Sequence, residues 1–107
     1  MQTLDEENYS DMCIDYNDKV IVISVSAHWC MPCRMQKPAI RELEKEYEGR
    51  VAFFEINADD NSKLCGELHV SALPTTIIKN GGGQLTTALV GVSSKSRIKD
   101  KIEELLK

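Results

Sequence analysis

Hydrophobic and polar positions follow two different periods along this chain. Short runs rich in β-branched and aromatic residues are typical of buried strands, and they occupy residues 19–26, 51–57, 75–79 and 84–90, with a shorter strand ending near residue 5. Longer segments that repeat an apolar residue every three or four positions predict helices over residues 6–16, 33–48 and 61–68, and from Ser93 or Ser94 onward.

The order of these elements predicts an α/β fold. Strands separated by helices in the first half of the chain call for parallel pairing, and the glycines of residues 80–83 predict a hairpin that adds antiparallel strands. We therefore expect a central mixed β-sheet flanked by helices on both faces, in a single domain that covers residues 1–107.

Individual helices carry signals of their own. In the 33–48 helix, an apolar stripe should face the core, Gly49 should end the helix, and Pro38 should kink it. The residues of this stripe are Ile40, Leu43 and Tyr47. The first and last helices show similar stripes, formed by Tyr9, Met12, Cys13 and Tyr16 and by Ile98, Ile102, Leu105 and Leu106.

Composition and charge narrow the classes of protein that remain. A net charge of −4 argues against nucleic acid and against an anionic membrane surface as partners. No apolar stretch reaches the length of a membrane span, and the acidic residues 1–11 do not have the pattern of a signal peptide. Four cysteines in 107 residues are too few for a disulfide scaffold, so we expect a protein of the cytoplasm.

The candidate chemistry lies in Trp29-Cys30-Met31-Pro32-Cys33, between the 19–26 strand and the following helix. Cysteines with this spacing can close a disulfide across one helical turn. The first cysteine would stand at the helix start, where unpaired N–H groups and the helix dipole favour a thiolate, the attacking species in disulfide exchange. Pro32 suits the first helical turn because its missing N–H has no partner to lose there.

Each of these residues also has a structural interpretation. A zinc site built on Cys30 and Cys33 would need two further ligands, and the remaining cysteines and histidines show no paired spacing, so we expect no metal. Those residues are Cys13, Cys65, His28 and His69. We expect Cys13 in the core and the histidines on the surface; Cys65 is either a core residue, which we favour, or a redox-sensitive thiol. Trp29 is either a flat apolar platform beside the thiolate, which we favour, or a core aromatic.

From about Leu4 to Leu106 the chain resembles the thioredoxin family. The Trp29–Cys33 motif is similar to the family's active-site signature, with Met31 where glycine is usual, and Pro38 falls where the family kinks its active-site helix. Three residues, Leu73-Pro74-Thr75, match the family's cis-proline loop. Val90-Gly91 matches the pair that lines its substrate groove.

The resemblance implies a thiol–disulfide oxidoreductase that reduces protein disulfides. Cys30 would be the nucleophile and Cys33 the resolving thiol, with Trp29, Met31, Pro32 and Pro74 supporting the site. Leu73, Thr75, Val90 and Gly91 would line the substrate groove. The resemblance further implies a monomer without a bound cofactor, recharged by a thioredoxin reductase that uses NADPH.

Two departures from the family pattern concern proton transfer and the site's surroundings. Many members carry a buried aspartate six residues before the first cysteine, where this chain has Ser24, and an aromatic residue four before it, where this chain has Ser26. A hydroxyl does not titrate near neutrality, so Ser24 cannot act as a general base. Glu55, on the strand expected beside Ser24, is a candidate proton relay in its place.

Two other functions fit the same fold. One is a disulfide oxidase or isomerase, which would differ by a higher reduction potential, and an exported oxidase would carry a signal peptide. The other is a thioredoxin-fold binding subunit that holds partners without turnover. Intact Cys30 and Cys33 argue against the second function, because a pure adaptor does not need them.

Overall fold

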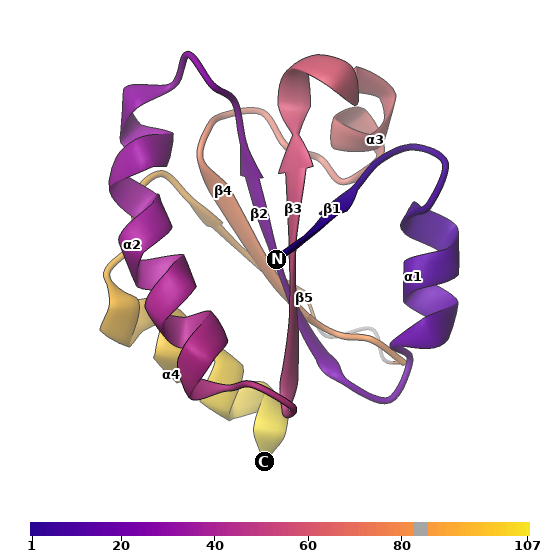
Figure 1. The fold of residues 1–107 in the computed structure, drawn as a ribbon, viewed down its shortest axis with the longest axis vertical. Coiled ribbons are helices and arrows are strands. Elements are labelled where there is room, and N and C mark those ends of the chain that lie inside the picture. Colours follow the sequence, from indigo (N-terminus) through magenta and orange to yellow (C-terminus); the bar gives the residue numbers. More distant parts are fainter. Residues whose placement is uncertain (83–85) are drawn as a thin grey trace.

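The computed structural model describes residues 1–82 and 86–107, in which five strands form one mixed sheet (Figure 1). The strands lie in the order β1-β3-β2-β4-β5. β1 and β2 pair with β3 in parallel, and β4 pairs antiparallel with β2 and with β5, as predicted. Their bounds are Gln2–Leu4 (β1), Val20–Ser26 (β2), Val51–Asn57 (β3), Thr75–Asn80 (β4) and Thr86–Val90 (β5). Gly83 of the predicted hairpin turn, with Gln84 and Leu85 of the predicted strand, lies outside the described residues.

Helices cover both faces of the sheet, which confirms the predicted layers (Figure 1). α2 (Met31–Glu46) and α4 (Lys95–Leu106) pack on one face, and α1 (Tyr9–Asp15) and α3 (Ser62–Glu67) on the other, with a short 3-10 helix, η1 (Ala58–Asp60), before α3.

β2 shows why the central strand carries apolar residues on both of its faces. Its side chains alternate between two cores, with Val20 and Val22 beneath α2 and α4 and with Ile21 and Ile23 beneath α1 and α3. The first core also contains the predicted stripes of α2 and α4, whose most buried members are Ile40, Leu43, Tyr47, Ile98 and Ile102.

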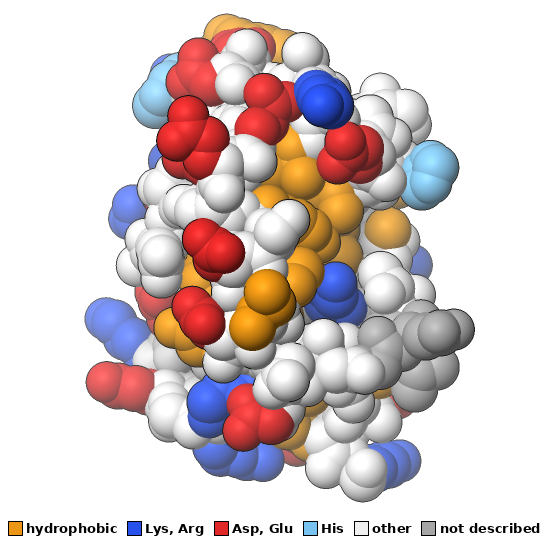
Figure 2. Space-filling model, turned by 90° about the vertical axis from the view of Figure 1, so that its right-hand side faces the viewer, with side chains coloured by type: hydrophobic (Ala, Val, Ile, Leu, Met, Phe, Trp, Pro, Cys, Tyr) orange, Lys and Arg blue, Asp and Glu red, His pale blue; other side chains and the backbone are white. Residues whose placement is uncertain are grey.

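The face that carries α1 and α3 is covered less completely. Figure 2 shows hydrophobic side chains gathered in a strip along the middle of this face, with acidic side chains beside it. Both helices are short, so several apolar side chains pack on the second core while remaining partly accessible: Tyr9, Cys13, Tyr16, Leu68, Val70 and Leu73. Cys13 thus belongs to the apolar face of its helix, as predicted.

The first helix begins later than predicted, at Tyr9 rather than at residue 6. The Asp5 carboxylate accepts the N–H groups of Glu7 and Asn8, and the Asn8 side chain accepts the N–H of Asp5. Together with the bond from the Tyr9 N–H to the Asp5 carbonyl oxygen at 3.1 Å, these side-chain bonds cap the turn that leads into the helix.

The long helix α2 begins earlier than predicted, at Met31, because Pro32 is well suited to the first turn. Its last turn is followed by Gly49 with φ of +83°, a left-handed conformation that suits glycine. Pro38 lies inside the helix, and the kink expected there stays a prediction.

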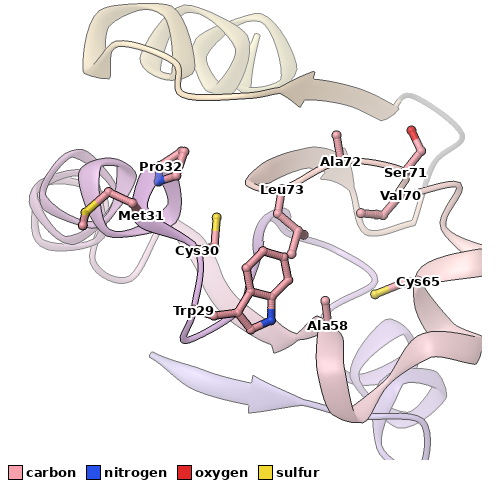
Figure 3. Close-up of a pocket in the computed structure, with 10 residues that line it drawn as sticks. All are labelled: Trp29, Cys30, Met31, Pro32, Ala58, Cys65, Val70, Ser71, Ala72 and Leu73. Carbon is pink, nitrogen blue, oxygen red and sulfur yellow. The ribbon is translucent and has the colours of Figure 1, made fainter.

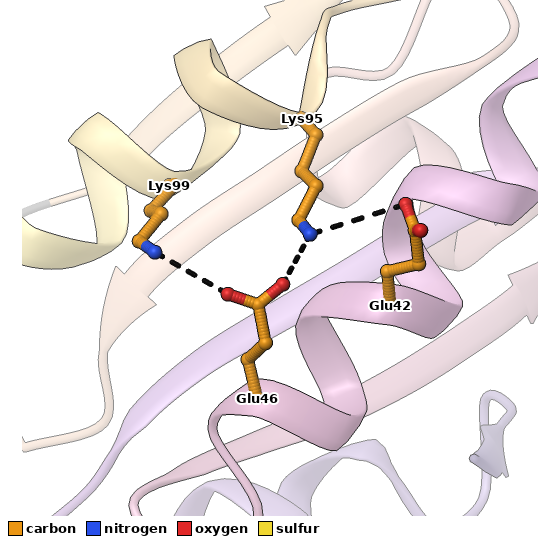
Figure 4. A network of polar contacts seen from close by, with 4 residues as sticks. All are labelled: Glu42, Glu46, Lys95 and Lys99. Carbon is orange, nitrogen blue, oxygen red and sulfur yellow. Dashed lines mark hydrogen bonds and ion pairs between the residues drawn. The ribbon is translucent and has the colours of Figure 1, made fainter.

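Ion pairs join α2 to α4 on the surface of the first core (Figure 4). The Glu46 carboxylate contacts both Lys95 and Lys99, the latter at 3.3 Å, and Lys95 also lies 4.0 Å from Glu42. These contacts lower the pKa of Glu46, chiefly through its hydrogen bond with Lys95, and raise the pKa of Lys95.

Candidate redox site

Cys30 and Cys33 are joined by a disulfide at the start of α2, with their Cα atoms 5.3 Å apart. Cys30 is the N-cap residue, with extended backbone angles, and Cys33 lies one turn along the helix. Their side chains are only 4% and 2% exposed. The strand-to-helix turn therefore places both cysteines, nearly completely buried, directly after β2.

The helix start also defines the electrostatics of Cys30. Its Sγ accepts a hydrogen bond from the backbone N–H of Cys33 at 3.3 Å, and the first turn of α2, which the structure describes in full, contains no acidic residue. A donor directed at the sulfur and the positive end of the helix dipole both favour negative charge on it. This geometry agrees with the sequence-based expectation of a thiolate at Cys30.

A mainly apolar pocket of about 570 Å³ opens beside Cys30 (Figure 3). One side comes from the active-site turn and the other from the segment before β4, with Cys65 across the pocket from Cys30 in this view. The lining residues are Trp29, Cys30, Met31, Pro32, Ala58, Cys65, Val70, Ser71, Ala72 and Leu73. Five of the predicted site residues thus meet in one pocket, together with neighbours that the sequence analysis did not identify.

Trp29 is held at the rim of this pocket by a residue missed in the sequence analysis. Its side chain is 69% exposed, and its indole N–H donates to the two carboxylate oxygens of Asp59 at 3.0 and 2.9 Å. Asp59 stands in η1, whose first turn is capped by the side chain of Asn57. Asn57 signals a capped turn locally, but it does not indicate which side chain Asp59 contacts. The position of Trp29 favours the platform interpretation over a core aromatic.

The second predicted loop lies next to the cysteines. The Leu73–Pro74 peptide bond is cis, as predicted, and Leu73 packs against the small cluster formed by Ala27, Cys30 and Cys33. The N–H of Gly91 donates to the carbonyl oxygen of Pro74 at 2.8 Å.

Strand pairing extends this arrangement to the remaining groove residues. Thr75 and Val90 are register partners on β4 and β5. The Thr75 hydroxyl is turned inward and donates to the Ala72 carbonyl at 2.7 Å, while the Val90 side chain is 64% exposed. These contacts connect the four predicted groove residues to one another, and among them Leu73 packs against the cysteine cluster, while their role as a groove stays a prediction.

Glu55 and Ser24 are register partners on β3 and β2, as expected. Glu55 is half-buried and accepts a long hydrogen bond, 3.4 Å, from the Thr3 hydroxyl. It lines two cavities beside the active-site turn, which it shares with Ser26 and Lys37. In the described part of the chain, the residues lining these cavities do not include Cys30 or Cys33. The proton relay stays a prediction.

The other titratable candidates are one thiol, Cys65, and two imidazoles, His28 and His69. Cys65 is 8% exposed, and burial raises the pKa of its thiol, with a smaller contribution from the carboxylate of Glu6. His28 and His69 are exposed, as expected. Among the described residues, no group of three or more His, Cys, Asp or Glu side chains is arranged to hold a metal ion, and no helix has the length and apolarity needed to cross a membrane.

Comparisons with known proteins agree with this geometry. The family model described as Thioredoxin matches residues 1–104. A thioredoxin of Chlorobaculum thiosulfatiphilum is 32% identical over 99 residues, covering 92% of this chain and 90% of the relative. Thioredoxin 2 of Chlorobaculum tepidum is 35% identical over 88 residues, covering 82% of this chain and 80% of the relative.

Two solved structures share the fold. Fasciola hepatica thioredoxin superposes with a TM-score of 0.87 at 24% identity, covering 97% of this chain and 98% of that one. Chloroplastic thioredoxin z gives 0.85 at 23% identity, covering 98% and 93%.

The cysteine pair and the family match do not favour the oxidase, isomerase or binding-subunit alternatives. Thioredoxins act on disulfide substrates and need no bound cofactor. Because the family model spans nearly the whole chain and the relatives exceed 30% identity, the chain belongs to the thioredoxin family and is a thiol–disulfide oxidoreductase of the protein-disulfide reductase type.

Proposed function

We propose that Cys30 is the nucleophile of this reductase and Cys33 its resolving thiol. The Cys30 thiolate attacks one sulfur of a substrate disulfide, forms a mixed disulfide and releases the first substrate thiolate. The Cys33 thiolate then attacks the Cys30 sulfur, which forms the Cys30–Cys33 disulfide and releases the second substrate thiolate. Two electrons pass from the protein to the substrate.

The observation that carries this assignment is the N-cap position of Cys30, whose sulfur accepts the N–H of Cys33. The same group also stabilises Cys30 as the leaving thiolate when a reductase that has formed a mixed disulfide with Cys30 resolves it with its second thiol. Cys30 lines the apolar pocket beside the site, and Cys33 is not among the described residues that line it, which suits a thiol that reacts only inside the mixed disulfide.

Substrate docking is proposed along the edge formed by Leu73, Thr75, Val90 and Gly91. An extended substrate segment would pair with the backbone of Leu73 as an added strand, with its side chains against the exposed Val90. Trp29, Met31 and Pro32 would support the site as the apolar surface around the disulfide, since Trp29 and Met31 are 69% and 61% exposed. Pro74 is buried and would support the site through its cis peptide bond with Leu73.

Glu55 is the proposed proton relay for Cys33. Ser24 provides no titratable group on β2, and Glu55 is its register partner on β3. The cavities that Glu55 lines are spacious enough, at about 490 Å³ for the larger, for water to carry the proton.

The oxidised protein would be recharged by a thioredoxin reductase that draws on NADPH. We propose that residues 1–107 act as one domain and as a monomer, because every exchange step uses only Cys30 and Cys33 of one chain. Four cysteines in 107 residues support a reducing compartment, the cytoplasm, as the place of action.

Replacing Cys33 with serine tests the assignment. Cys33→Ser should trap disulfide substrates on Cys30, because the first attack survives and the resolving attack is lost. Non-reducing gels should show mixed disulfides that dithiothreitol removes, while Cys30→Ser should trap nothing. The control Cys13→Ser, in α1 and not among the described residues that line the pocket beside Cys30, should reduce insulin as the unaltered protein does. Equal trapping by both active-site variants, or normal insulin turnover by Cys33→Ser, would contradict the assigned roles.

A further inference from the structure

Gln36 is a buried polar residue within the apolar stripe of α2. It follows Cys33 by three positions and precedes Ile40 by four, so all three side chains face the core. The Gln36 side chain is only 1% exposed. Burying an amide is unfavourable unless its hydrogen bonds are made, so the Gln36 amide requires partners inside the protein.

Both bonds of the Gln36 amide go to a single residue, Ser93. The Nε2 group donates to the Ser93 carbonyl oxygen at 3.0 Å, and Oε1 accepts the Ser93 N–H at 2.7 Å. The side chain thus pairs with the Ser93 backbone as a neighbouring strand would, across 57 positions in the sequence. Ser93 is itself 5% exposed, so these bonds are shielded from water.

Ser93 belongs to the loop that forms one wall of the proposed groove. This loop leaves β5 at Val90 and enters α4 at Ser94, whose hydroxyl caps the helix by accepting the N–H of Arg97. At its other end, the N–H of Gly91 is bound by the carbonyl of Pro74. The side chain of Val90, at the end of β5, is 64% exposed, and that of Val92, between these anchors, is 48% exposed.

We propose that Gln36 is a positioning residue that fixes the Val90–Val92 wall relative to Cys30 and thereby selects protein disulfides as substrates. α2 begins at the active-site turn, so the Gln36 bonds connect the helix that carries the redox pair directly to the wall. A wall held before binding does not have to be ordered when a peptide docks, which favours binding. A small disulfide without a peptide segment makes no use of the wall. This inference rests on the proposed function.

Gln36→Met separates an effect on peptide docking from an effect on the thiols. Methionine has nearly the length of glutamine, but it forms neither hydrogen bond with Ser93. With insulin as substrate, we expect KM to rise about tenfold, the size of effect that losing one to two net hydrogen bonds produces. The kcat for insulin, and the rate constant for reduction of hydroxyethyl disulfide, should stay within about twofold of the unaltered protein.

Ile102→Val in α4 is the matched control. This substitution removes one methyl group from the core beneath α2 and α4 and so lowers stability, but it leaves the Gln36–Ser93 hydrogen bonds in place. Its KM for insulin should therefore equal that of the unaltered protein below the unfolding transition. If Gln36→Met does not fold, Gln36→Asn serves instead, since its amide is one methylene too short to reach both Ser93 groups.

If the unaltered protein does not reduce insulin, the proposed function is wrong. If it does, an unchanged KM in the Gln36 variant overturns the positioning role. An equal loss with hydroxyethyl disulfide overturns it as well, because the residue would then act on the thiols. A similar rise of KM in Ile102→Val would also overturn it, by tracing the effect to stability alone.

Discussion

Replacing Ser24 with aspartate should destabilise the protein in a pH-dependent way, because the new carboxylate would be buried beside Glu55. Ser24 is 9% exposed on the central strand β2. Its register partner is Glu55, and the two side chains share a small cavity under α2 with Lys37 and Arg41. The variant therefore places two acidic side chains in adjacent positions of the same sheet face.

The size of the effect follows from this spacing. Neighbouring strands lie about 4.8 Å apart, so the two carboxylates would be roughly 6 Å apart. At an effective dielectric constant of about 20, their repulsion is about 3 kcal/mol. Lys37 and Arg41 are exposed and screened by water, so they offset only part of it. We expect a loss of about 2 kcal/mol near neutral pH, which lowers Tm by roughly 10 °C.

The sign of the pH dependence follows from the raised pKa of the new aspartate. Burial and the neighbouring carboxylate both raise its folded-state pKa above the unfolded value of about 3.9. The penalty should therefore be absent below about pH 3.9, grow as pH rises, and level off above the folded-state pKa.

Urea unfolding of four proteins provides the assay: the unaltered chain, Ser24→Asp, Glu55→Gln and the double variant. Glu55→Gln should restore most of the stability lost in Ser24→Asp near neutral pH. Ser24→Asn is the uncharged control and should show no such pH dependence. If Ser24→Asp loses as much stability in the Glu55→Gln background as in the original one, repulsion between the two carboxylates is not the cause.

Two further predictions follow from the titrating groups. In the reduced protein, iodoacetamide should label Cys30 first at mildly acidic pH and Cys65 only as pH rises, because burial raises the pKa of Cys65; preferential early labelling of Cys65, seen by mass spectrometry, would contradict this. Glu46→Gln should lower the free energy of unfolding near neutral pH by removing the pairs with Lys95 and Lys99. Since the folded-state pKa of Glu46 is lowered from 4.5, the difference should vanish as pH falls through that lowered value, and a difference that persists in acid would refute the ion-pair explanation.

Much of this protein could be predicted from local patterns. The run of residues 20–25, apolar at every position except Ser24, identified a strand covered on both faces, because only such a strand buries every side chain. The stripe of Ile40, Leu43 and Tyr47 identified the face of α2 that meets the core. The cysteine spacing at a strand-to-helix turn identified the chemistry, since helix geometry alone brings two sulfurs that are three residues apart together.

Element boundaries were less certain because side chains compete with the helix for backbone groups. Acidic residues before Tyr9 predicted a helix from residue 6, but the side chains of Asp5 and Asn8 bind backbone N–H groups of this segment, and the regular helix starts only at Tyr9. η1 was missed for a different reason: a single helical turn is too short to show a hydrophobic period in the sequence.

Only the tertiary structure determined which distant residues surround the redox pair. Asp59 reaches Trp29 across 30 positions and Gln36 reaches Ser93 across 57, and nothing near either residue in the sequence specifies its partner. The sequence by itself determined the strands, the helices and the reactive cysteines, because these depend on propensity, period and spacing within a few residues. The walls of the groove depend on the order of the strands and on how the helices pack against the sheet. Both result from packing the whole core at once, so no short segment of the sequence specifies them.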